Sequence, residues 1–128
     1  MPPRLFSLGA AVALTLSGCA TVDNAALTEL RDTFVASGGV CDSWTPFDEP
    51  RSQGALECDS GAKLYVFDSD AAERDLVKTE LETNTDIRAR THIMLSGETW
   101  LVIDRIAVIV HVFPSMGGII QGRNGANP

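Results

Sequence analysis

The first 18 residues constrain this chain most, because they suit neither a domain surface nor a membrane-spanning helix. Arg4 precedes an uncharged apolar run from Leu5 to Leu16 that is rich in Ala and Leu. About a dozen residues at roughly 1.5 Å each reach only about 18 Å as a helix, against a bilayer core of about 30 Å. A cationic start followed by such a run is typical of a signal peptide. We therefore expect export, removal of residues 1–18, and a fold that begins after them.

The end of the apolar run resembles the lipobox of bacterial lipoproteins, in which a branched apolar residue and two small residues precede a cysteine. Here these residues are Leu16, Ser17, Gly18 and Cys19. The resemblance implies that Cys19 receives a diacylglyceryl group, that the Gly18–Cys19 bond is cleaved, and that Cys19 becomes the mature N-terminus. An ordinary secretory signal that leaves a free Cys19 is the alternative. Because two or more acyl chains form a stable anchor, the resemblance predicts a protein held on the extracytoplasmic face of the cell membrane.

Charge limits the partners of the mature chain. Residues 19–128 are enough for a single domain with its own core, and their 9 Lys and Arg against 17 Asp and Glu give a formal charge of −8. Such a surface repels nucleic acid, anionic lipid head groups and anionic wall polymers. We therefore expect no nucleic-acid partner, and contact with the membrane through lipid on Cys19 rather than through charge.

The cysteine count agrees with export. Once Cys19 is assigned to lipid, Cys41 and Cys58 are the remaining thiols, 17 positions apart. An oxidising compartment favours a disulfide between them, and closing a loop of that length stabilises a domain by about 3 kcal/mol. A zinc site is the alternative, but paired C-x₂-C spacing is missing and neither His92 nor His111 lies near either thiol in sequence.

Apolar periodicity predicts three helices. Leu27, Leu30 and Phe34 form a stripe at helical spacing. Asp70 and Glu73 form a capping-box analogue at the start of another helical pattern. The last segment has strong strand character from its Val and Ile residues, but Asp104 as a cap and Gly117-Gly118 as a stop favour a helix. The predicted helices span residues 24–36, 71–82 and 104–116.

Two hairpins are predicted between these helices, since turn residues separate short strand-like runs. Asp59-Ser60-Gly61 and Ser96-Gly97-Glu98 supply the turns, while an irregular loop over 40–54 and a polar connection over 83–90 complete the chain. The predicted strands span residues 55–58, 63–68, 91–95 and 99–103. We therefore expect an α+β fold, an antiparallel four-stranded sheet from two hairpins with two or three helices packed on one face.

From Cys41 onward the chain also resembles a group of small actinobacterial lipoproteins of uncharacterised function. The shared features are a cysteine pair, a Cys-x-Ser/Asp-Gly hairpin turn, a Gly-x-x-Trp strand, and a Gly-Gly after the last helix. In this chain they are Cys41, Cys58 to Gly61, Gly97-Glu98-Thr99-Trp100 and Gly117-Gly118. Relatives more often carry Asn where this chain has Thr99. The resemblance implies no particular activity.

Residues that could carry chemistry are sparse. The sequence lacks a Gly-x-Ser-x-Gly nucleophile motif, and His92 and His111 lie in strand-like and apolar surroundings that favour a structural role. The segment that starts with the acidic residues Asp68 to Asp75 has neither the Gly at the sixth position nor the Glu at the twelfth position of an EF-hand loop. Helix capping therefore explains these acidic residues better than binding of Ca²⁺. We therefore expect no catalytic set, no metal site and no cofactor.

The aromatic residues Trp44 and Phe47 are the best candidates for contact with a partner. Pro46 and Pro50 restrain the loop around them, and the expected disulfide closes it. Aromatic side chains held in this way make good binding hot spots, although packing onto the sheet is the alternative for both. The sequence thus favours a non-catalytic binding module at the cell envelope, with an unknown envelope protein or small ligand as partner. A small envelope hydrolase or an enzyme accessory factor is the alternative.

Overall fold

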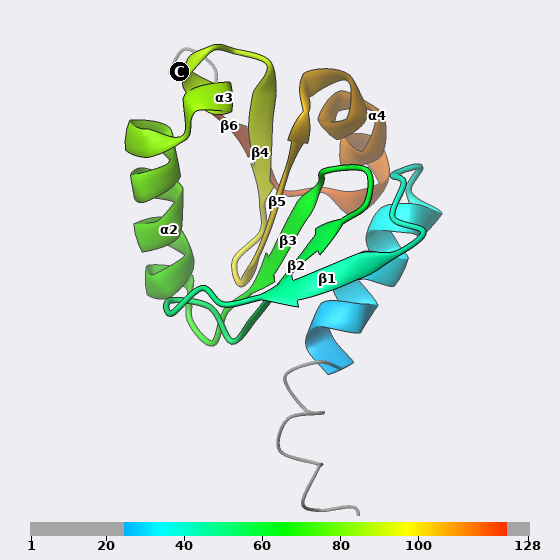
Figure 1. The fold of residues 1–128 in the computed structure, drawn as a ribbon, viewed down its shortest axis with the longest axis horizontal. Coiled ribbons are helices and arrows are strands. Elements are labelled where there is room, and N and C mark those ends of the chain that lie inside the picture. The colour runs from blue at the N-terminus through cyan, green and yellow to red at the C-terminus, as the bar shows by residue number, and fades with distance from the viewer. Residues whose placement is uncertain (1–24, 123–128) are drawn as a thin grey trace, which may run out of the picture.

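The computed structural model describes residues 25–122, which form an α+β domain around an antiparallel sheet (Figure 1). The predicted signal peptide, the Gly18–Cys19 cleavage site and the lipidation of Cys19 lie outside these residues. The elements in chain order are an N-terminal helix over 25–36, β1 (Trp44–Phe47), β2 (Gly54–Cys58), β3 (Lys63–Val66), α2 (Asp70–Thr83), α3 (Thr85–Arg88), β4 (His92–Ser96), β5 (Trp100–Arg105), α4 (Ile106–Met116) and β6 (Ile119–Gln121).

The sheet has the strand order β1-β2-β3-β5-β4-β6, and every neighbouring pair is antiparallel. The predicted hairpins are β2 with β3 and β4 with β5, and they join through the pairing of β3 with β5. Gly61 ends the first hairpin turn with φ +102°, a conformation that glycine adopts without strain. The α+β class and the antiparallel sheet built on two hairpins are therefore confirmed.

The predicted number of elements is wrong, because short elements at the margins of the fold were missed. The described residues form six strands and four helices, not four strands and two or three helices. β1 lies in the segment expected to be an irregular loop, and Pro46 suits it because an edge strand tolerates a missing backbone N–H. β6 pairs with β4 at the other edge, and α3 begins where the Asn84 side chain accepts hydrogen bonds from the N–H groups of Asp86 and Ile87.

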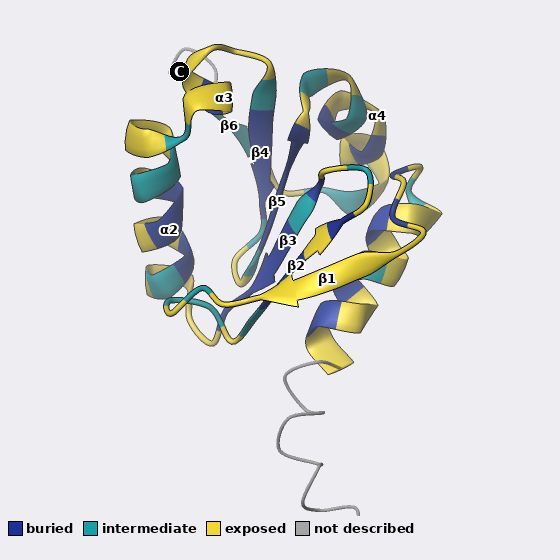
Figure 2. Ribbon diagram, viewed as in Figure 1, coloured by how far each residue is buried: buried dark blue, intermediate teal, exposed yellow. Residues whose placement is uncertain are grey.

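The central strands are largely buried (Figure 2). Their apolar side chains point alternately to the two faces of the sheet and build a core on each face. On one face, Leu64 and Val66 pack with the N-terminal helix and α4. On the other face, Tyr65 and Phe67 pack with α2 and α3. The prediction that the helices cover one face is therefore wrong. Helices cover both faces because both rows of strand side chains are apolar, and each row needs a helical layer to exclude water.

The two N-caps predicted for the later helices, Asp70 and Asp104, are both wrong. Asp104 lies in β5, so α4 begins two residues later than predicted, and its N-cap Arg105 makes no side-chain capping bond. Ser69, rather than Asp70, is the N-cap of α2, and its hydroxyl accepts a hydrogen bond from the N–H of Ala72. The helical prediction for the last apolar segment is confirmed by α4, and Gly117 ends that helix with an N–H bond to the carbonyl of Phe113.

No helix within residues 25–122 has the length and apolar content needed to cross a membrane.

The predicted disulfide is confirmed. Cys41 and Cys58 are bonded, and both are buried in the core that contains the N-terminal helix. Cys58 ends β2, while Cys41 follows the N-terminal helix by a few residues. The bond therefore ties the N-terminal helix to the sheet.

Candidate functional site

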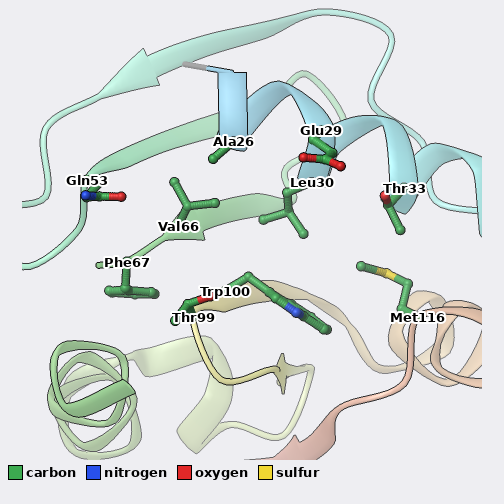
Figure 3. Close-up of a pocket in the computed structure, with 10 residues that line it drawn as sticks. All are labelled: Ala26, Glu29, Leu30, Thr33, Gln53, Val66, Phe67, Thr99, Trp100 and Met116. Atoms are coloured by element: carbon green, nitrogen blue, oxygen red, sulfur yellow. The ribbon is translucent and has the colours of Figure 1, made fainter. Parts of the chain in front are cut away.

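A cleft of about 300 Å³ opens between the N-terminal helix and one end of the sheet (Figure 3). We call it the Trp100 cleft. Its lining comes from several segments that are distant in sequence: Ala26, Glu29, Leu30, Thr33, Gln53, Val66, Phe67, Thr99, Trp100 and Met116. The size is at the lower end of the range for small-molecule sites.

Trp100 supplies a flat aromatic wall of the cleft, and two glycines leave room for its ring. A Cβ on Gly97 would overlap the indole, and one on Gly118 would lie 3.1 Å from the ring and 2.7 Å from the carbonyl oxygen of Ser96. Gly118 also has φ +91°, which favours glycine. The Gly97-x-x-Trp100 spacing and the later Gly-Gly pair thus position the indole, whose ring remains partly exposed.

The lining of the cleft contains both apolar and polar side chains. Leu30 and Val66 face Trp100 and Met116 across the cavity, while Glu29, Thr33 and Gln53 lie around them (Figure 3). Among the lining residues within 25–122, only Glu29 carries a charge. The arrangement suits a ligand with an uncharged, apolar portion.

Backbone hydrogen bonds hold the end of the cleft in place. The N–H of Gln53 donates to the carbonyl of Val66 at 2.8 Å, and the N–H of Phe67 donates to the carbonyl of Thr99 at 2.9 Å. These bonds join the segment before β2, the end of β3 and the β4–β5 turn. The end of the cleft lined by Gln53, Phe67 and Thr99 is therefore tied to the sheet by backbone bonds.

Trp44 and Phe47 lie on the edge strand β1, and all four residues of that strand are exposed (Figure 2). Trp44 pairs with Cys58 and Phe47 pairs with Ala55. Since Cys58 and Ala55 belong to the cores on opposite faces, the two aromatic side chains also lie on opposite faces. The structure therefore does not bring them together on one surface.

Each aromatic residue of β1 has its own neighbour. The Arg31 guanidinium lies 4.3 Å from the centre of the Trp44 ring, and the Phe47 ring meets the Tyr65 ring edge to face at 5.6 Å. Trp44 is 41% exposed and Phe47 is 36% exposed. Trp44 also borders a shallow hollow of about 200 Å³ beside Glu57 and Asp59, and neither aromatic residue lines the Trp100 cleft.

The histidines lie away from the Trp100 cleft. Nδ1 of His92 is 2.9 Å from the Thr91 hydroxyl at the start of β4, and His111 is exposed on α4 beside Gly38. Over residues 25–122, no group of three or more His, Cys, Asp or Glu side chains is placed to hold a metal ion. Of the acidic residues before and within α2, Asp70 forms an ion pair with Arg74 at 2.9 Å and Asp75 lies 3.7 Å from Arg51.

Glu73 and Asp104, which the sequence assigns to helix capping, are instead buried carboxyl groups. Burial raises the pKa of Glu73 to about 7, while Arg74 and a hydrogen bond from Ser96 lower it and Asp70 raises it further. Burial also raises the pKa of Asp104 on β5, against the lowering effects of Arg105 and His92. Glu73 could have been found from helical spacing, because it precedes the buried Leu76 and Val77 by three and four positions.

Comparisons with protein family models, with curated proteins and with solved structures found no match to this chain.

Proposed function

We propose that the protein is a lipid-anchored extracytoplasmic binding module of the bacterial cell envelope. The lipobox-like end of the apolar run supports the anchor on Cys19. The Cys41–Cys58 disulfide supports an oxidising compartment, because such bonds persist outside the cytosol. The excess of acidic residues supports attachment through lipid rather than through charge.

The Trp100 cleft is the observation that carries the binding role. It combines an indole, further apolar side chains and a polar border in a cavity held by backbone hydrogen bonds. Binding sites for small molecules commonly have this composition. Binding is favoured over hydrolysis because the His92–Thr91 contact, a feature that catalysis could use, lies outside the lining of the cleft.

Replacement of Cys19 tests the anchor. The Cys19→Ser variant lacks the thiol that receives lipid, so it should stay unprocessed or leave the membrane fraction. Membrane retention with normal processing of this variant would contradict anchoring at Cys19.

Photo-crosslinking tests the binding site in intact cells. A photoreactive amino acid at position 33 faces the cleft, whereas the same group at position 28 lies on the exposed side of the same helix. Illumination should give a discrete adduct from position 33 and none from position 28. Equal adducts from both positions, or none from position 33, would remove the cleft as the binding site.

A further inference from the structure

We propose that the Trp100 cleft takes up one acyl chain of a bilayer lipid, which is the ligand class of the binding role and rests on the proposed function. The apolar part of the cleft supplies the first argument. Leu30, Val66, Trp100 and Met116 surround the cavity, and a Met side chain adapts readily to a flexible apolar partner (Figure 3). A volume of about 300 Å³ suits part of one chain rather than a whole lipid molecule.

The distance to the membrane supplies the second argument. Ala26 lines the cleft and follows Cys19 by seven positions. Seven fully extended residues span at most about 25 Å at roughly 3.5 Å each. If Cys19 carries the anchor, the cleft must stay within that reach of the bilayer surface. Acyl chains are then the most concentrated apolar groups near it.

Charge supplies the third argument. Of the described side chains that line the cleft, Glu29 alone is charged, and it is negative. An anionic ligand would meet this carboxylate without a cation among the lining residues to offset it. An uncharged hydrocarbon chain avoids that repulsion, and a zwitterionic head group can stay at the bilayer surface.

Tryptophan fluorescence tests the proposal, because the chain contains two Trp residues in different places. Trp100 lines the cleft and Trp44 lies on the edge strand. The full-length lipidated protein is reconstituted into phosphatidylcholine vesicles whose acyl chains carry bromine, a short-range quencher of Trp emission. The variant Trp44→Phe has Trp100 as its single Trp and should lose most of its emission relative to unbrominated vesicles. Trp100→Phe, which leaves Trp44 alone, should lose little.

Filling variants show whether quenching occurs inside the cleft. In the Trp44→Phe background, Ala26→Phe places a ring in the cleft and should restore most of the emission, and Thr33→Phe should do the same. Ala25→Phe is the matched control, since Ala25 is exposed on the same helix and does not line the cleft. Emission in unbrominated vesicles checks that each variant keeps its fold.

Three results would overturn the proposal: no quenching of Trp100, equal quenching of Trp44, or quenching that both filling variants leave unchanged. Equal quenching of Trp44 and Trp100 would mean that the surface of the domain inserts into the bilayer. A discrete protein adduct from position 33 without quenching of Trp100 would reject the acyl chain and keep the binding role. Failure of the Cys19-dependent anchor would reject the proposed function itself.

Discussion

Glu73 places a titratable carboxyl group inside the core between α2 and the sheet. The residue is 3% exposed, and its Oε2 atom has no hydrogen-bond partner. The nearby Ser96 hydroxyl on β4 lowers the Glu73 pKa, but this hydroxyl also accepts a hydrogen bond from the Gln121 side chain at 2.8 Å. Ionisation of Glu73 therefore charges a site that offers little compensation. The substitution Glu73→Gln removes that charge with little change in shape.

The magnitude follows from the pKa. Burial raises the Glu73 pKa from 4.5 to about 7 in the folded state. The stabilising effect of the protonated form is fully present below the unfolded pKa of 4.5 and is lost as the pH rises to about 7. A pKa difference of this size corresponds to about 3 kcal/mol. Glu73→Gln should therefore be about 3 kcal/mol more stable than the wild type above neutral pH, and nearly equal to it in acid.

Urea unfolding at about pH 4 and about pH 8 measures this difference. Glu82→Gln is the matched control, because Glu82 is exposed on the same helix. Asp104 also has a raised pKa and will leave some acid-side stabilisation in every variant. A free-energy difference between Glu73→Gln and the wild type that does not change with pH would refute the reasoning.

The remaining predictions concern stability and are read from urea unfolding. Cys41→Ala with Cys58→Ala should lower the free energy of unfolding by about 3 kcal/mol, since the disulfide closes a 17-residue separation; an unchanged value would contradict its structural role. Gly61→Ala should lower the free energy of unfolding by about 1–2 kcal/mol, because of its positive φ alone. Gly118→Ala should lower it further, because its Cβ would also meet the Ser96 carbonyl, and equal losses for the two variants would disprove that contact. Trp44→Ala and Phe47→Ala should each cost about 1 kcal/mol, as exposed residues with one aromatic or cationic neighbour; losses of about 3 kcal/mol or more would mean that they are core residues.

The central fold could be predicted because its patterns are local. Leu27, Leu30 and Phe34 repeat at helical spacing, and the turns at Gly61 and Gly97 separate the strands of each hairpin. All three helices and both hairpins follow from such patterns. Their confirmation shows that local spacing and turn chemistry decide the framework.

The sheet edges and the cleft could not be predicted, because they depend on contacts between distant segments. β1 contains Pro46 and β6 has three residues, so neither has strong strand character until it pairs with a neighbour. The Trp100 cleft joins residues from Ala26 to Met116, and no local spacing relates them. The sequence makes Trp44 and Phe47 joint candidates for contact with a partner, but strand alternation places them on opposite faces.

The mass of the intact mature protein extracted from membranes tests the central claim most directly. A lipid-anchored binding module should have a chain that begins at Cys19, carries a diacylglyceryl group there, and lacks the two hydrogens lost when the Cys41–Cys58 bond forms. A mass that retains residues 1–18, or a chain beginning near Cys19 without lipid, would contradict a lipid-anchored binding module.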